Sequence, residues 1–278
     1  MQKSELKRYV FLNGKFVPEE ETKLQVLAPG FLYGFGLYET MRFCKGRIVY
    51  FKEHLERIQD ACKITGIRFP YGLRYLRKMI RKAVKLNDLA DAYVKLVFWK
   101  AVEGTDTVII ARKNTPLPKQ KYRRGFCAAI SSLRQAEDCF LCRIKSTNRL
   151  LYELSFEEAK RRGADEALIL NNRGLIAEGS RSNIFFARAG ELFTPQLDCG
   201  CLEGITRKVV FALAKKSGLR IFEGRFTPRE LYCADEAFLT NSLKGIMPLT
   251  KVEDKVIGKA KCGKITDLLI KRYNCLLK

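Results

Sequence analysis

The most informative stretch of this sequence runs from residue 144 to residue 186 and reads IKSTNRLLYELSFEEAKRRGADEALILNNRGLIAEGSRSNIFF. Apolar residues recur at helical spacing over 149–162, which predicts an amphipathic helix. Two short apolar runs, 166–171 and 184–188, are bounded by turn residues and predict strands. The stretch therefore indicates a mixed α/β fold in which helices and strands alternate.

The same patterns continue outward on both sides. Before the stretch we expect a hairpin at 8–18 around Asn13-Gly14, strands at 37–43, 47–51, 92–99, 106–112 and 125–131, and helices at 52–64 and 73–84. After it we expect strands at 191–194, 219–223 and 236–240, helices at 205–217 and 263–275, and a capping box that starts at Thr227.

The polar segment 113–121 contains two prolines and is the best candidate for a linker. We therefore expect an α+β protein with a small N-terminal domain (1–115), an interdomain linker (116–121) and a larger C-terminal domain (122–278).

The bulk composition is that of a soluble globular enzyme, with 47% hydrophobic and 29% charged residues among 278. No run of about 18 apolar residues is present, so we expect no membrane partner. The N-terminus has no apolar signal core, from which we expect a cytoplasmic location.

The net charge of +22 is large. A basic face can bind nucleic acid through phosphates, but here lysines and arginines are spread along the whole chain without a basic tail. We interpret the charge as a basic surface that attracts anionic ligands, and we expect no nucleic-acid partner. A basic nucleic-acid-binding protein on a retired enzyme scaffold remains the non-enzymatic alternative.

Ten cysteines include one C-x-x-C pair, Cys139 and Cys142, and one C-x-C pair, Cys199 and Cys201. A structural zinc site usually combines two C-x-x-C pairs or one such pair with two histidines, and His54 is the only histidine. We therefore expect no metal and interpret the cysteines as mostly small apolar residues.

Four features are candidates for chemistry, although each has an ordinary structural explanation. Gly204-Ile205-Thr206 opens a predicted helix, where unpaired N–H groups can bind phosphate or simply receive a cap. Glu178 follows a predicted strand, Lys145 precedes a helix, and Arg57 lies in one. These patterns alone lead to a two-domain α/β enzyme with a phosphate ligand as an option.

Taken together and in this order, the blocks resemble the class IV pyridoxal-5'-phosphate (PLP) enzymes. This family contains branched-chain aminotransferases, D-amino acid aminotransferases and 4-amino-4-deoxychorismate lyases. The resemblance runs nearly end to end, through GFLYGFGLYETMR (30–42), HLERI (54–58), residues 144–186, LFTPQLDCGCLEGITRKVV (192–210) and ADEAFLTNSLKGIMPLTKVE (234–253).

The resemblance implies PLP as cofactor and a role for each matching residue. Lys145 falls where the family places the lysine that binds PLP and moves the proton at the reacting carbon. Glu178 matches the carboxylate that pairs with the pyridine nitrogen. Arg57, Ile205, Thr206 and Ser242 match residues that bind the phosphate.

The resemblance also implies a fold of type IV, like that of D-amino acid aminotransferases, with a small α/β domain, a pseudo-barrel domain and PLP in the cleft between them. Members of the family form homodimers in which the partner's small domain completes the site. Tyr33 is a candidate for that contribution, or an interface aromatic without a catalytic duty.

Three reactions of the family compete. Branched-chain aminotransferases usually carry a tyrosine five residues after the lysine, where this chain has Leu150, and a Gly-Thr-Ala segment, where it has Asn241-Ser242-Leu243 with Thr240 before them. D-Amino acid aminotransferases of the well-known type use a histidine on the substrate carboxylate, and His54 already lies in the HLERI helix.

Aminodeoxychorismate lyases often show K-x-x-N-R-L after the lysine, a strand like YVKLVF (93–98), and TNS near the phosphate, all of which occur here. We therefore favour a lyase of folate synthesis that releases pyruvate and gives 4-aminobenzoate. An aminotransferase acting on branched-chain or other amino acids with 2-oxoglutarate is the alternative. Either substrate is a small anion, for which Lys95, Arg42, Tyr93 and Tyr33 are the candidate contacts.

Overall fold

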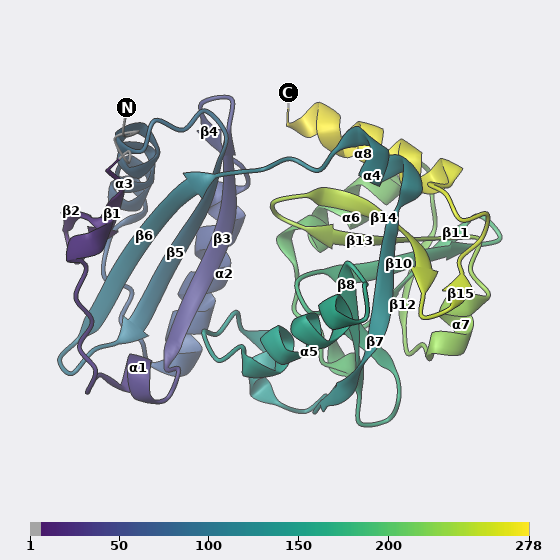
Figure 1. Ribbon diagram of the computed structural model, residues 1–278, viewed down its shortest axis with the longest axis horizontal. Helices are drawn as coiled ribbons and strands as arrows, with labels where there is room; N and C mark the ends of the chain where they lie inside the picture. Colours follow the sequence, from purple (N-terminus) through teal and green to yellow (C-terminus); the bar gives the residue numbers. More distant parts are fainter. Residues whose placement is uncertain (1–6, 278) are drawn as a thin grey trace. The chain divides into compact units, whose positions relative to one another are not determined.

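The computed structural model describes residues 7–277, which divide into two compact units (Figure 1). The first unit runs up to Thr115 and also includes Ile144–Asn148. The second begins at Pro116, is interrupted by that short segment, and resumes at Arg149. Both units contain helices and strands, so the mixed α and β fold class predicted from the sequence is confirmed.

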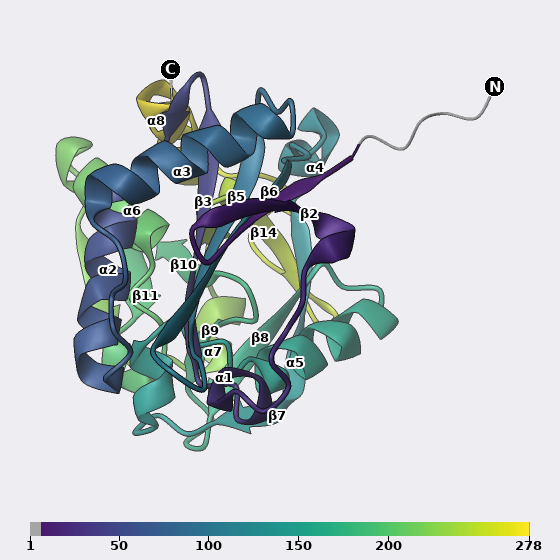
Figure 2. The same ribbon diagram turned by 90° about the vertical axis from the view of Figure 1, so that its left-hand side faces the viewer.

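The first unit is an antiparallel sheet in the order β2-β1-β6-β5-β3-β4, with α2 and α3 on one face (Figure 2). Its described elements are β1 (Tyr9–Leu12), β2 (Lys15–Pro18), η1 (Glu19–Glu21), α1 (Pro29–Leu32), β3 (Gly36–Cys44), β4 (Arg47–Ile48), α2 (Phe51–Thr65), α3 (Leu73–Leu86), β5 (Ala92–Lys100) and β6 (Thr105–Lys113).

Alternation along the central strands separates a core face from an open face. On β5, Val94, Leu96 and Phe98 are buried in the core that the helices cover, whereas Tyr93 and Lys95 are half-buried on the opposite face. Successive side chains of a strand point to opposite faces, which explains the alternation. One face of the sheet thus forms the hydrophobic core with the helices, and the other face carries polar side chains that the core does not cover.

The predicted hairpin around Asn13-Gly14 is confirmed, but the strand predicted over 47–51 is wrong beyond Ile48. The chain turns at Tyr50, which has a left-handed backbone with φ of 51°, and α2 begins at Phe51. The apolar run was therefore shared between the end of a strand and the first buried residue of a helix.

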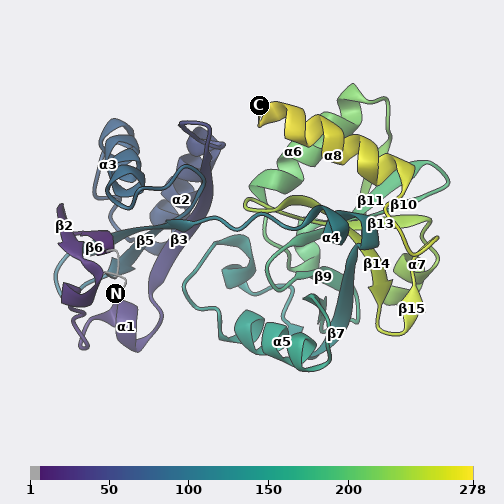
Figure 3. The same cartoon turned by 45° about the horizontal axis from the view of Figure 1, so that its top comes forward.

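The second unit contains a larger mixed sheet in the order β12-β11-β10-β13-β14-β7-β8-β9, with β15 paired to β14. Helix α5 packs on β7 and β8, while α6 and α8 pack on each other and on β13 (Figure 3). The described elements are α4 (Lys119–Arg124), β7 (Phe126–Gln135), η2 (Phe140–Arg143), α5 (Leu150–Arg161), β8 (Glu166–Asn171), β9 (Ile176–Gly179), β10 (Asn183–Arg188), β11 (Glu191–Pro195), η3 (Leu197–Cys199), α6 (Ile205–Lys216), β12 (Ile221–Gly224), α7 (Pro228–Tyr232), β13 (Glu236–Asn241), β14 (Gly245–Val252), β15 (Lys255–Val256) and α8 (Lys264–Leu276).

Three strands of this sheet were not predicted, namely β9, β14 and the two-residue β15. Strand β14 contains Pro248, which normally argues against a strand because it cannot donate a ladder hydrogen bond. Strand β9 is only four residues long and ends in Glu178-Gly179, a pair that is typical of turns. The capping box at Thr227 is confirmed, and a short helix starts at Lys119 inside the predicted linker.

Between residues 7 and 277, no helix combines the length and the apolar character needed to cross a bilayer. The same residues contain no group of three or more histidine, cysteine or acidic side chains that could hold a metal ion.

Candidate active site

The segment that carries Lys145 is attached to β3 of the first unit through an isolated antiparallel β-bridge between Leu37 and Ser146. The backbone N–H of Tyr38 donates to the Lys145 carbonyl at 2.9 Å, and Thr147 N–H donates to the Gly36 carbonyl at 2.9 Å. The Thr147 hydroxyl also donates to the Gly34 carbonyl at 2.8 Å. Backbone pairing therefore fixes the position of Lys145 relative to β3.

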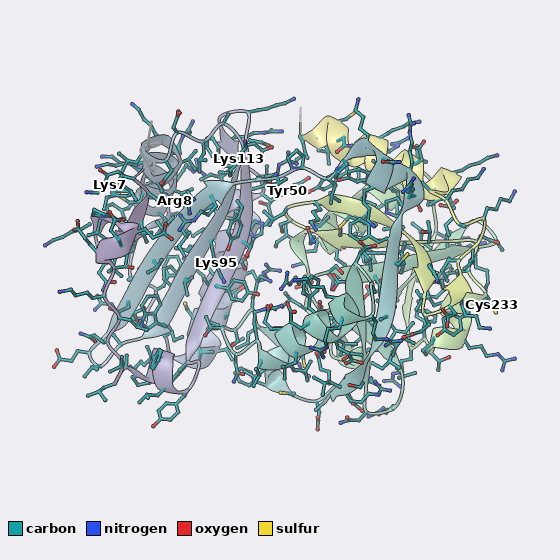
Figure 4. The ribbon with its side chains drawn as sticks, in the orientation of Figure 1. Lys7, Arg8, Tyr50, Lys95, Lys113 and Cys233 are labelled. Atoms are coloured by element: carbon teal, nitrogen blue, oxygen red, sulfur yellow. The ribbon has the colours of Figure 1, made fainter. Side chains whose placement is uncertain are left out.

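The Lys145 side chain lies over an aromatic ring. Its Nζ is 4.6 Å from the centre of the Tyr38 ring, and Lys95 Nζ, from the neighbouring strand, is 4.8 Å from the same centre. Lys95 is labelled in Figure 4 on the strand β5. The negative face of a phenol attracts cations, so the buried Tyr38 ring holds two lysines in one place.

A buried carboxylate lies on the opposite face of β3. Leu37, Met41 and Phe43 point toward the helices, and Glu39, which has the same parity, is fully buried among them. Its carboxylate accepts hydrogen bonds from Arg57 Nε and Nη2, both at 2.7 Å, and contacts His54 Nδ1 at 2.6 Å.

The helix supplies both partners because His54 and Arg57 are three residues apart and therefore share one face of α2. Burial by itself raises the pKa of the Glu39 carboxyl, but Arg57 and His54 outweigh this and lower it to about 2. Burial lowers the pKa of His54, and Arg57 and Lys145 lower it further, against the opposing effect of Glu39. The Arg57 guanidinium is thus fixed by a carboxylate that stays ionised.

The other sequence-predicted contacts of the first unit differ in their surroundings. Arg42 forms a two-point ion pair with Asp91, through Nε at 3.1 Å and Nη2 at 2.6 Å. Tyr93 is half-buried, and burial raises its pKa, with Tyr38 adding to the effect. Tyr33 is 72% exposed at the end of α1. Of the two cationic candidates, Arg42 and Lys95, Arg42 is the one for which an ion pair with an acidic side chain is found among residues 7–277.

Glu178 lies on β9 of the second unit and is 5% exposed, rather than in a solvated turn. Its Oε1 accepts from the Tyr152 hydroxyl at 3.2 Å. Its Oε2 accepts from Asn183 Nδ2 at 3.3 Å and from Leu202 N–H at 3.1 Å. All three partners donate, which is the pattern that stabilises an ionised carboxylate.

Asn183 connects this carboxylate to the start of α6. Its Nδ2 also donates to the Leu202 carbonyl at 2.8 Å. A Cβ atom added to Gly204 would lie only 2.0 Å from Asn183 Oδ1. Only glycine fits at residue 204, directly before the first residue of the helix, Ile205. The loop that leads into α6 is therefore positioned by the same amide that holds Glu178.

The first turn of α6 fits a bound phosphate. It contains no acidic residue, and its N–H groups and dipole favour an anion. The Thr206 hydroxyl oxygen is buried there without a hydrogen-bond partner among the described residues, and so is the Thr240 hydroxyl oxygen. Thr240 pairs with Asn183 across β10 and β13. Buried hydroxyls rarely stay unsatisfied, so both fit a ligand with oxygen acceptors such as the phosphate of PLP.

Ser242 follows β13 in a turn that Asn241 stabilises. The Asn241 Oδ1 accepts from the N–H groups of Leu243 at 3.1 Å and Lys244 at 2.8 Å. This Asx-type turn fixes the backbone on both sides of the half-buried Ser242.

The predicted residues are thus divided between the units. Lys145, Arg57, Tyr33, Arg42, Tyr93 and Lys95 belong to the first, and Glu178, Ile205, Thr206 and Ser242 belong to the second. Sequence reasoning missed Glu39, Tyr152 and Asn183. Glu39 could have been found as the one charged residue on the apolar side of its strand; no comparable pattern marks Tyr152 or Asn183.

Comparison with known proteins identifies the family to which the chain is similar. Residues 36–252 match the family described as amino-transferase class IV. The branched-chain-amino-acid aminotransferase of Pseudomonas aeruginosa is 30% identical over 95% of this chain and 91% of its own length. The aminodeoxychorismate lyase of Bacillus subtilis is also 30% identical, over 97% of this chain and 94% of its own length.

Solved structures agree with this. The T.th. branched-chain amino acid aminotransferase with pyridoxamine 5'-phosphate is 29% identical, with a TM-score of 0.90 over 96% of this chain and 93% of that one. The enzyme of Thermoproteus uzoniensis with norvaline is 33% identical, with a TM-score of 0.88 over 96% and 94%. The type IV fold implied by the sequence resemblance is therefore confirmed.

The buried Glu39 ion pair generates a stability prediction. Glu39→Gln should lower the free energy of unfolding by about 3 kcal/mol at neutral pH, since the carboxyl pKa is 4.5 when unfolded and about 2 when folded. A lowered folded pKa gives stability that is complete above about pH 4.5 and is lost as the pH falls toward 2. Urea unfolding at several pH values measures both the loss and its disappearance in acid.

Asp91→Asn is the matched control, because it removes the carboxylate from a two-point arginine pair that is partly exposed. We expect it to cost less than about 1 kcal/mol. Equal losses of unfolding free energy in Glu39→Gln and Asp91→Asn would contradict the larger stabilisation that we assign to the buried Glu39 ion pair.

Proposed function

This chain belongs to the amino-transferase class IV family, and on that premise we propose that it transfers the amino group of branched-chain or similar apolar L-amino acids to a 2-oxo acid. In this reaction the donor becomes its 2-oxo acid and the acceptor becomes an amino acid. The enzyme depends on PLP as its cofactor.

PLP supplies an electron sink for negative charge on the reacting carbon of a bound substrate. In our proposal Lys145 binds PLP covalently and later carries the proton at that carbon. Glu178 holds a proton on the ring nitrogen, which its fixed set of donors suits. Binding of the phosphate is assigned to Arg57, Ile205, Thr206 and Ser242.

One observation carries the choice of reaction, namely the ion pair between Arg42 and Asp91. A lyase substrate with two carboxylates calls for two cations, and Lys95 and Arg42 were the candidates. Because Asp91 neutralises Arg42, Lys95 is the one of the two without a carboxylate partner among residues 7–277. A single lysine beside the Tyr38 ring and Tyr93 suits a donor with an apolar side chain, and the same lysine can in turn bind the distal carboxylate of the 2-oxo acid acceptor.

Aminodeoxychorismate lyase is the second candidate, because Leu150 stands where branched-chain aminotransferases usually have tyrosine. Leu150 is 69% exposed and offers no hydroxyl. Asn148 and the Thr240-Asn241-Ser242 segment follow the lyase pattern as well.

We also propose that the chain forms a homodimer through the segment 24–35 of the first unit. Seven large apolar residues of this segment are exposed: Leu24, Val26, Leu27, Phe31, Leu32, Tyr33 and Phe35. Contiguous exposed apolar surface of this kind is typical of an interface. In such a dimer Tyr33 is covered by the partner, in agreement with its predicted role.

Lys145→Ala tests the cofactor assignment. The wild-type protein with PLP should show the visible absorbance of lysine-bound PLP, and the variant should lose that band together with all activity. The matched control is Lys244→Ala, which removes an exposed lysine from the second unit and should keep the band. A wild-type protein that stays colourless with added PLP would refute the assignment of Lys145.

A substrate comparison tests the reaction. The purified enzyme receives L-leucine with 2-oxoglutarate, and in a separate assay 4-amino-4-deoxychorismate without an acceptor. We expect acceptor-dependent glutamate formation in the first and no pyruvate in the second. Pyruvate release without amino transfer would establish the lyase instead.

Phe31→Asp tests the dimer. A charge placed in the apolar segment should convert a dimer into a monomer, as measured by light scattering on a sizing column. Ile64→Asp is the matched control, because Ile64 is a comparably exposed apolar residue on α2. The proposal fails if the wild type is a monomer or if Phe31→Asp stays dimeric.

A further inference from the structure

Tyr152 contacts Glu178 from the first turn of α5. Its hydroxyl is the donor to Glu178 Oε1, whereas the other two donors described above, on Asn183 and Leu202, both contact Oε2. Tyr152 therefore restrains Oε1, while Asn183 and Leu202 restrain Oε2. A carboxylate held at both oxygens has little freedom to rotate.

The ring of Tyr152 is itself held in place. The Arg149 guanidinium lies 4.7 Å from the ring centre, and Arg149 Nη2 donates to the Ser180 carbonyl at 2.8 Å. Ser180 follows Glu178 by two residues, in the turn after β9. Tyr152 and Arg149 thus connect the start of α5 to Glu178 near the end of β9 and to the turn that follows β9.

The hydroxyl keeps its proton under all working conditions. Burial raises the pKa of Tyr152, and the Glu178 charge raises it further. The phenol therefore remains a donor, and the pair is a charge-assisted hydrogen bond rather than a shared proton.

The place of Tyr152 in the chain adds a second argument. It lies seven residues after Lys145 and two after Leu150, the position where the sequence resemblance implies a tyrosine in branched-chain aminotransferases. This chain has leucine at residue 150, but the Tyr152 hydroxyl, also in the first turn of α5, contacts Glu178.

We propose that Tyr152 is a positioning residue that fixes the Glu178 carboxylate and thereby sets how strongly the PLP ring nitrogen holds its proton. The inference rests on the proposed function, in which Glu178 pairs with that nitrogen. Tyr152 does not touch the reacting carbon. Its effect passes through Glu178, so removal of its hydroxyl should resemble a weakened form of Glu178→Gln.

The test uses the holoenzyme and two measurements other than activity. Spectrophotometric pH titration of lysine-bound PLP gives a midpoint for the wild type, Glu178→Gln and Tyr152→Phe. The Tyr152→Phe midpoint should move in the same direction as that of Glu178→Gln, but less far. Equilibrium dialysis should show PLP binding weakened by roughly tenfold, as for the loss of a hydrogen bond to a charged group.

Tyr232→Phe is the matched control, since it removes the hydroxyl of another half-buried tyrosine of the second unit. It should leave both the midpoint and the PLP affinity unchanged. A Tyr152→Phe protein with a wild-type midpoint, or with a shift opposite to that of Glu178→Gln, overturns the inference while the proposed function stands. If Glu178→Gln itself leaves the titration unchanged, the role proposed for Glu178 fails.

If Tyr152→Phe folds poorly, Arg149→Gln provides the second variant. It keeps the hydroxyl but removes the guanidinium above the ring and the bond to Ser180. A midpoint shift toward that of Glu178→Gln supports the inference, and a wild-type midpoint in this variant contradicts it.

Discussion

The local structure around the second unit's candidate site depends on satisfying one buried carboxylate. Glu178 is nearly inaccessible to water, and an ionised carboxylate in such surroundings must be hydrogen-bonded. The partners come from a helix start, a neighbouring strand and the loop before α6. These elements are held together by the same contacts that hold the carboxylate, so the role proposed for Glu178 and the local fold depend on one set of hydrogen bonds.

The first unit also contains a buried carboxylate, Glu39, but a charged arginine pairs with it in place of neutral hydrogen-bond donors alone. Glu39 lies on the core face of β3, where an unpaired carboxylate would cost several kcal/mol. Arg57 and His54 offset the desolvation cost of the buried Glu39 carboxylate, and the same contacts fix the Arg57 guanidinium on the face of α2. A buried ion pair contributes little net stability, but loss of one partner is expensive. The pair is therefore better understood as a way to orient Arg57 than as a way to stabilise the fold.

Most of the regular structure could be predicted from the sequence because periodicity is a local property. The helices over α2, α5 and α6 and the hairpin at Asn13 follow directly from apolar spacing and turn residues. The attachment of Ile144–Asn148 to the first unit could not, since it depends on backbone pairing with Gly36 and Tyr38, more than a hundred residues away. Burial of Glu178 was missed for the same reason, as only tertiary contacts remove it from water.

In the aminotransferase reaction that we propose, the contrast between Lys95 and Arg42 also bears on how one site serves two substrates. A transaminase admits an apolar side chain and the distal carboxylate of an acceptor in turn, so a cation there must be able to withdraw. An arginine held at two points by Asp91 is rigid, whereas lysine carries its charge on a long, flexible apolar stem. The Lys95 ammonium can make a cation–π contact with the Tyr38 ring when no carboxylate is present. In this proposal the open face of the sheet changes its polarity through the Lys95 side chain, without a change in the backbone.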